Sequence, residues 1–107
     1  MPGVAEFVRV GAAAEVPDGE IKEFDLPGVR IAVTCVDGRF HAFGGECTVE
    51  GCQLAEGSIE DGEAVACPDD GSAFDLTTGE PLRGPAEDPI PVFAVRVERG
   101  WLEVAVA

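Results

Sequence analysis

The chain has 107 residues, 46% of them hydrophobic, and its 21 acidic and seven basic residues give a net charge of −14. No apolar run approaches the about 20 residues that span a bilayer, and so acidic a surface repels phosphate groups and anionic lipids, which excludes membranes and nucleic acids as expected partners. A basic protein partner would be attracted at low salt, although the same charge also serves solubility.

Short runs of alternating apolar and polar residues, separated by Gly and Pro, predict an all-β antiparallel fold. The length is that of one domain, expected over residues 1–107. The expected strands, in chain order, are 5–10, 20–26, 29–36, 39–43, 63–67, 73–75, 92–98 and 101–106.

Two tight hairpins are predicted. Asp37-Gly38 and Arg99-Gly100 each favour the positive φ angles of a type I′ turn between two strands. In the second hairpin, the alternation places four apolar residues among the expected core: Val95, Val97, Leu102 and Val104.

Helix is expected to be short and peripheral, because no long window keeps a helical apolar stripe free of Gly and Pro. Residues 11–16 and 86–88 are the weak candidates. The segment Pro81–Pro91 contains four prolines and is expected to form an ordered, extended loop.

The chain has four cysteines: Cys35, Cys47, Cys52 and Cys67. The first residues lack the basic and apolar segments of a secretory signal, so a cytoplasmic location is expected. There, cysteines are expected to be thiols, ligands or redox groups and not structural disulfides. Cys35 lies within an apolar run and is interpreted as a buried structural residue.

The other cysteines lie in two turn-rich loops, residues 47–54 and 67–75. Each loop follows an expected strand and contains a glycine where the backbone must bend. Two such loops can approach each other and enclose a metal centre.

These loops resemble those of the Rieske family, which read Cys-x-His followed by Gly and Leu, then Cys-Pro-x-His-Gly-Ser followed by Phe-Asp and a Thr-Gly turn. The matching residues are Cys47, Gly51, Leu54, Cys67, Pro68, Gly71, Ser72, Phe74, Asp75, Thr78, Gly79 and Pro81, and Gly84-Pro85 resembles the family's proline loop that covers the cluster. The resemblance implies an antiparallel β-sandwich with a small cluster-binding subdomain of two loops, about residues 44–82. It also implies a [2Fe-2S] cluster on Cys47 and Cys67.

The sequence departs from the family at both histidine ligands, which are replaced by Val49 and Asp70. Valine offers no lone pair, and aspartate supplies a charged oxygen where the family has a neutral imidazole. An ordinary Rieske cluster is therefore not expected. The only histidine, His41, lies on the expected strand 39–43, does not match a ligand position and is interpreted as an ordinary strand residue.

Cys52 occupies a position that some Rieske proteins use for a disulfide between the loops, but its partner position holds Asp69. Cys52 and Asp70 are therefore possible substitute ligands that would complete a non-standard metal site with Cys47 and Cys67. The alternative is that no cluster is bound.

No nucleophile with a base, phosphate-binding glycine loop or dinucleotide motif is present, so independent enzyme activity is not expected. The resemblance implies an electron-transfer component that works between a flavin reductase and a terminal oxygenase or reductase. Two alternatives remain open: a clusterless interaction subunit similar to the small subunit of NAD(P)H nitrite reductase, or an ordinary Rieske ferredoxin whose ligands have been replaced.

Overall fold

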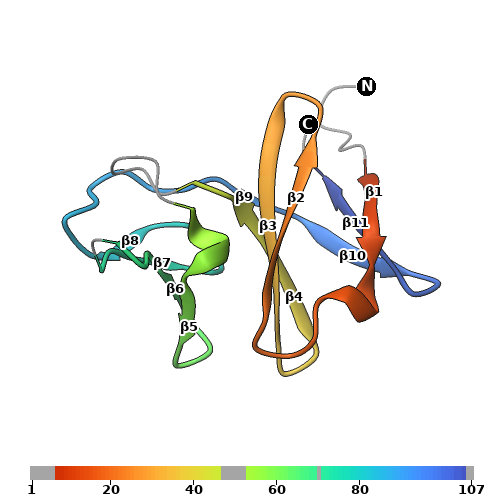
Figure 1. Cartoon of the computed structure of the whole chain (residues 1–107), viewed down its shortest axis with the longest axis horizontal. Coiled ribbons are helices and arrows are strands. Elements are labelled where there is room, and N and C mark those ends of the chain that lie inside the picture. The colour runs from red at the N-terminus through yellow and green to blue at the C-terminus, as the bar shows by residue number, and fades with distance from the viewer. Residues whose placement is uncertain (1–6, 47–52, 70, 106–107) are drawn as a thin grey trace.

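The computed structural model describes residues 7–46, 53–69 and 71–105, and in this part of the chain the strands form three antiparallel sheets (Figure 1). The first sheet has the order β1-β11-β10, with β1 at Phe7–Ala12, β10 at Val95–Glu98 and β11 at Trp101–Ala105. The second has the order β2-β3-β4-β9, with β2 at Ile21–Leu26, β3 at Val29–Val36, β4 at Arg39–Gly44 and β9 at Val92–Phe93. The third has the order β5-β6-β7-β8, with β5 at Ser58–Glu60, β6 at Ala64–Ala66, β7 at Ala73–Asp75 and β8 at Pro81–Arg83.

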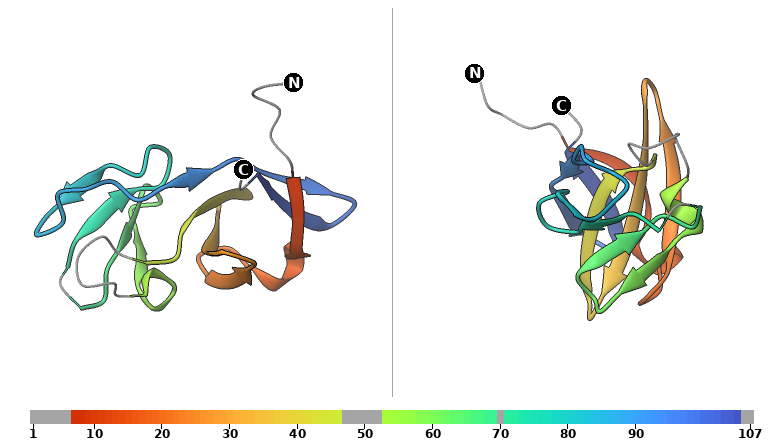
Figure 2. Two further views of the ribbon diagram at one scale, coloured as in Figure 1. Left: turned by 90° about the horizontal axis from the view of Figure 1, so that it is seen from above. Right: turned by 90° about the vertical axis from the view of Figure 1, so that its left-hand side faces the viewer.

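The β2–β3–β4 sheet lies between the other two, which are at opposite ends of the molecule (Figures 1 and 2). Its central strand β3 is buried on both faces, because every residue from Ile31 to Cys35 is at most 6% exposed. Side chains that alternate along β3 enter two different hydrophobic cores.

The sandwich core fills the space between the second sheet and the β1–β11–β10 sheet. It consists of Val16, Ile31, Val33, Cys35, Ala42, Leu102 and Val104. The subdomain core lies on the other side of β3 and β4, against the third sheet. It consists of Ala32, Phe43, Leu54, Val65, Cys67, Phe74, Leu76, Ala86 and Ile90.

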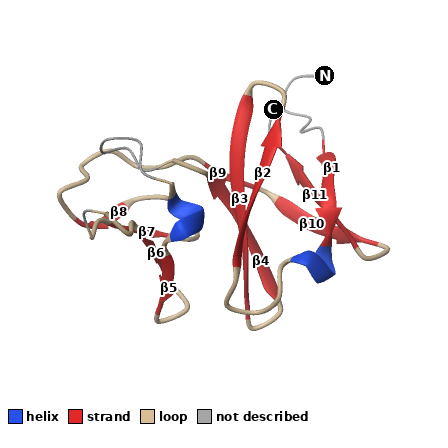
Figure 3. Ribbon diagram, viewed as in Figure 1, coloured by secondary structure: helices blue, strands red, loops and turns tan. Residues whose placement is uncertain are grey.

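The all-β prediction is confirmed: the described residues contain two 3-10 helices of three residues each, which are the short helical turns in Figure 3. These are the 3-10 helices η1, Ala13–Glu15, inside the expected segment 11–16, and η2, Leu54–Glu56, which was not expected. Residues 86–88 are not helical. With three residues each, η1 and η2 fall far short of the about 20 residues of a membrane-spanning helix, and the described part of the chain has no other helix.

Both predicted hairpin turns are confirmed. Asp37 and Gly38 have φ angles of 51° and 81°, and Arg99 and Gly100 have 51° and 85°. Such pairs of positive φ values match the twist of the flanking strands.

Three predictions about strands were wrong. The expected strand 92–98 is interrupted at Ala94, where the chain leaves the β4 sheet as β9 and joins β11 as β10. Val97, expected in the core, is 45% exposed because it lies on the edge strand β10 beside the hairpin turn. Pro81–Arg83, expected to be loop, forms β8, where Pro81 is tolerated because β8 is at the edge of its sheet.

Candidate functional site

The ends of the first cysteine loop are held together by backbone contacts. The Leu54 N–H donates to the Gly45 carbonyl oxygen at 3.0 Å, and Glu46 and Gln53 form an isolated antiparallel bridge. Leu54 is fully buried in the subdomain core, which fixes the return of the chain after the loop.

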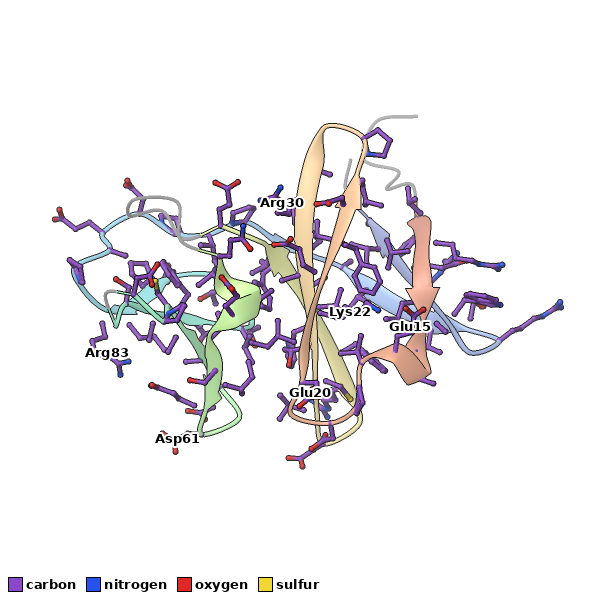
Figure 4. The ribbon with its side chains drawn as sticks, viewed as in Figure 1. Glu15, Glu20, Lys22, Arg30, Asp61 and Arg83 are labelled. Atoms are coloured by element: carbon purple, nitrogen blue, oxygen red, sulfur yellow. The ribbon has the colours of Figure 1, made fainter. Side chains whose placement is uncertain are left out.

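Arg30 on β3 connects the base of the first loop to the second sheet (Figure 4). Its carbonyl oxygen accepts the Gly45 N–H at 3.1 Å, and its guanidinium lies 3.1 Å from Asp25, 3.6 Å from Glu23 and 3.8 Å from Glu46. The hydrogen bond to Asp25 and the charge of Glu23 raise the pKa of Arg30. The exposed cation therefore offsets part of the acidic charge beside the loop.

The second cysteine loop is a tight turn between β6 and β7. The Cys67 N–H donates to the Ser72 carbonyl oxygen at 2.7 Å, and the Gly71 N–H donates to the Cys67 carbonyl oxygen at 3.3 Å. Gly71 has φ +79°, a conformation that glycine adopts without strain. The Cys67 side chain is only 3% exposed.

Ser72 connects the second loop to the proline-rich segment. Its side chain is fully buried, and its hydroxyl oxygen accepts a hydrogen bond from the Ala86 N–H at 3.0 Å. The Gly84–Pro85 peptide bond that precedes Ala86 is cis. Ser72 in the second loop is thus hydrogen-bonded directly to the proline-rich segment Pro81–Pro91.

Arg83 on β8 holds the second loop from the opposite side. Its Nε–H donates to the Gly71 carbonyl oxygen at 2.7 Å, and its two terminal nitrogens donate to the two carboxylate oxygens of Glu60 at 3.0 and 3.1 Å. The hydrogen bonds from Arg83 lower the pKa of Glu60. One side chain therefore joins the loop, β8 and β5.

Asp75 closes the turn that follows β7. Its carboxylate accepts hydrogen bonds from the Thr77 N–H at 2.7 Å and the Thr78 N–H at 2.9 Å. The contacts with Thr78 and then Thr77 lower the pKa of Asp75. Gly79 has φ +80°, and a Cβ atom there would overlap the Ile90 carbonyl oxygen, so this turn requires glycine.

His41 lies on β4 opposite Thr34 and lines a cleft of about 460 Å³ between β4 and the turn after β7. Burial and then the nearby Arg39 lower the pKa of His41, while Asp75 opposes this effect. His41 therefore belongs to this cleft, whose lining includes Arg39 and Asp75.

Of the predicted site residues, the structure describes only Cys67. Cys47, Val49, Cys52 and Asp70 lie outside the described residues. Cys35 is free and buried, as predicted, whereas Cys67 is disulfide-bonded, although the cysteines were expected to be thiols, ligands or redox groups and not structural disulfides. Because iron binds the thiolate, Cys67 would serve as a ligand only when reduced.

Within the ranges 7–46, 53–69 and 71–105, no group of three or more His, Cys, Asp or Glu side chains could hold a metal ion. At the four family ligand positions the chain supplies Cys47, Val49, Cys67 and Asp70, that is, two cysteines, one carboxylate and one side chain with no donor atom. This donor set does not fit a cluster that is held by two thiolates and two imidazoles.

Sequence reasoning missed the contacts of Arg83 and of the Ser72 hydroxyl. Arg83 and Glu60 are 23 residues apart, and Ser72 and Ala86 are 14 apart. No local pattern signals such pairs, although the Ser72 position itself was part of the matched loop motif.

Comparison with known proteins identifies the family. The sequence model of the family described as the Rieske [2Fe-2S] domain matches residues 6–94. The 3-phenylpropionate/cinnamic acid dioxygenase ferredoxin subunit of Escherichia coli K12 is 39% identical over 87 residues, which are 81% of each chain.

Two solved structures are similar over nearly the whole chain. The first comes from a complex of oxygenase and ferredoxin in carbazole 1,9a-dioxygenase, with a TM-score of 0.85, 35% identity and 92% of each chain covered. The second, assigned as the NADH-dependent nitrite reductase small subunit of Mycobacterium tuberculosis, has a TM-score of 0.87 and 26% identity, with 97% of each chain covered. The chain belongs to the Rieske [2Fe-2S] domain family.

Proposed function

We propose that this chain is a ferredoxin-like component of a multicomponent oxygenase or related redox system. The observation that carries the proposal is the hydrogen-bonded frame of the second loop: the tight turn at Cys67, the Ser72–Ala86 contact and the Arg83–Gly71 contact. The role is that of an electron carrier or accessory subunit and not of an independent enzyme. Its curated relatives are ferredoxin subunits, which supports this assignment.

The proposed partners are a flavin reductase and a terminal oxygenase or reductase. A similar ferredoxin is found in complex with an oxygenase, and a net charge of −14 favours a partner with a basic docking surface. We also propose a cytoplasmic location, where the Cys67 disulfide would be reduced to the thiol that a metal ligand requires.

The family implies a [2Fe-2S] cluster, and we propose that any cluster held here is non-standard. Cys47 and Cys67 would supply thiolates, with Cys52 and Asp70 as substitute ligands. The second candidate function is a clusterless interaction subunit. It is favoured by the missing donor at Val49 and by the similarity to the nitrite reductase small subunit.

Iron and acid-labile sulfide content, measured on protein purified without oxygen, distinguishes the two candidates. About two irons and two sulfides per chain, with an EPR signal after reduction, would support a redox role for a non-standard cluster. Loss of iron in Cys52→Ser or Asp70→Asn would then identify the substitute ligand. Colourless, iron-free protein would contradict the electron-transfer role and favour the interaction subunit.

Restoring the two histidines tests whether the loop frame is intact. We expect Val49→His combined with Asp70→His to allow a Rieske cluster to assemble on reconstitution with iron and sulfide, because the family's other loop residues remain. Val49→Ala combined with Asp70→Ala is the control and should bind no cluster. Failure of the double histidine variant to bind iron and sulfide would contradict the inferred positions of the ligands.

A further inference from the structure

The β1–β11–β10 sheet has a second surface that the proposed function does not use. The strand register places Leu102 and Val104 toward the sandwich core, and therefore places the alternating residues on the opposite side. This side, together with Arg99 in the adjacent turn, is called the outer face. Its principal residues are Phe7, Arg9, Arg96, Glu98, Trp101 and Glu103.

The outer face differs in charge from the rest of the molecule. It carries three of the seven basic residues, Arg9, Arg96 and Arg99, but only two of the 21 acidic residues, Glu98 and Glu103. Its charge is therefore +1, and the remainder of the chain has −15. At physiological ionic strength, charges more than about 8 Å away are largely screened, so a docked group mainly senses the local arginines.

The arginine side chains of the outer face are held in place. Arg96 lies 2.8 Å from the Glu103 carboxylate and 4.1 Å from the centre of the Phe7 ring. Arg9 lies 3.7 Å from the same carboxylate and 5.0 Å from the centre of the Trp101 ring. Planar guanidinium groups stack on aromatic rings in this way, which reduces the entropy that binding would cost.

Arg9 and Arg96 also retain guanidinium N–H groups that Glu103 does not use and that a partner could bind. The two guanidinium groups share the carboxylate of Glu103, whose side chain is only 13% exposed, while the side chains of Arg9 and Arg96 are 54% and 52% exposed. A guanidinium has five N–H donors, so one shared carboxylate cannot use the donors of both. Arg99 forms no ion pair with any described residue.

We propose that the outer face binds a protein partner that presents carboxylates beside an apolar side chain. The carboxylates would accept bidentate hydrogen bonds from the arginines, and the apolar side chain would pack on Trp101, which is 41% exposed. Tryptophan and arginine are among the residue types enriched at the positions that contribute most binding energy in protein interfaces. A basic partner would be repelled here although the rest of the chain attracts it.

The position of the outer face gives the proposal its functional meaning. The β1–β11–β10 sheet lies at the end of the molecule away from the β5–β8 sheet (Figures 1 and 2). An acidic partner on the outer face would leave the region around Cys67 and Arg83 accessible to a second, basic partner. The inference goes beyond the proposed function and does not require a cluster.

Trp101 provides a direct test, because the chain contains one tryptophan and no tyrosine. The probe is a short synthetic peptide of glutamates and leucines, titrated into the full chain at about 0.15 M salt, where screening is physiological. We expect a saturable change in Trp101 fluorescence. A lysine–leucine peptide of the same length is the control and should not produce this change.

Two matched double variants locate the binding site. Arg9→Gln with Arg96→Gln should weaken binding of the acidic peptide about tenfold or more, equivalent to about 1.4 kcal/mol. Lys22→Gln with Arg39→Gln removes the same charge elsewhere and should change the affinity less than about twofold. Should the first variant unfold, Arg9→Gln with Arg99→Gln is used, since Arg96 then still pairs with Glu103.

Saturable binding that is lost only in the outer-face variants supports the proposal. Absence of saturable binding would overturn it, and so would equal weakening in both double variants. Since neither result depends on iron content or redox activity, the test fails or succeeds independently of the electron-transfer role.

Discussion

Replacement of Ser72 by alanine should destabilise the protein, because it removes a buried hydrogen-bond acceptor. Ser72 is fully buried, and Ala86, whose N–H donates to its hydroxyl oxygen at 3.0 Å, is only 5% exposed. Ser72→Ala therefore leaves a buried N–H without this acceptor, which costs about 1–3 kcal/mol. With a urea slope of about 1.5 kcal/mol per M, a loss of about 2 kcal/mol lowers the unfolding midpoint by about 1.3 M.

The assay is urea unfolding followed by Trp101 fluorescence, with amide hydrogen exchange at Ala86 as a local readout. The chain's other serine, Ser58 on β5, is exposed, so Ser58→Ala is a matched control that should shift the free energy of unfolding by less than about 0.5 kcal/mol. Equal midpoints for the two variants, or unchanged exchange at Ala86 in Ser72→Ala, would refute the reasoning.

Three further predictions concern packing, backbone conformation and pH. Leu102→Ala should lower the free energy of unfolding in urea by about 2–5 kcal/mol, because the Leu102 side chain is fully buried. Leu82 is 58% exposed, so Leu82→Ala should be nearly neutral. Similar urea midpoints for the two variants would contradict the position of Leu102 in the sandwich core. Gly79→Ala should lower the free energy of unfolding clearly more than Gly28→Ala, because both glycines have φ near +80° but only a Cβ at Gly79 would overlap a neighbouring backbone. A loss of about 1–2 kcal/mol is expected for Gly28→Ala. Equal thermal midpoints of the two variants would count against the overlap. The pKa of Asp75 lies below its usual 3.8, so the stabilisation by this carboxylate is present above that value and is lost as pH falls through the folded-state pKa. Between about pH 5 and pH 2, the urea midpoint of Asp75→Asn should therefore fall less than that of the wild type. An identical dependence of the two midpoints on pH would exclude this contribution.

Turn chemistry and alternation predicted most of the strands. The pair Asp37-Gly38 fixes the register of β3 and β4 locally, and the expected limits of the strand 29–36 agree with the structure. The segment 92–98 was predicted as one strand because alternation cannot show that a chain changes sheets at Ala94. Likewise, β5 has only three residues, too few to give a periodic signal.

The loop motif of the site was predictable from the sequence, whereas the contacts that hold the loop in place were not. The motif locates Cys67, Gly71 and Ser72, whose backbone forms the tight turn. The contacts of Arg83 depend on the third sheet bringing β5 beside the loop, and no local sequence pattern encodes that proximity. The domain limits 1–107 and 44–82 and the ligand set of Cys47, Cys67, Cys52 and Asp70 stay predictions.

The subdomain core has a consequence for how this sequence can evolve. Nine buried residues and the Arg83 contacts support the bases of both loops, and none of these interactions requires a metal. A substitution at ligand position 49 or 70 thus removes a cofactor contact without changing any of these nine core residues. Selection on folding alone would therefore retain Phe74 and Ser72 while leaving positions 49 and 70 free to change, and the sequence matches the family motif at the first pair and departs from it at the second.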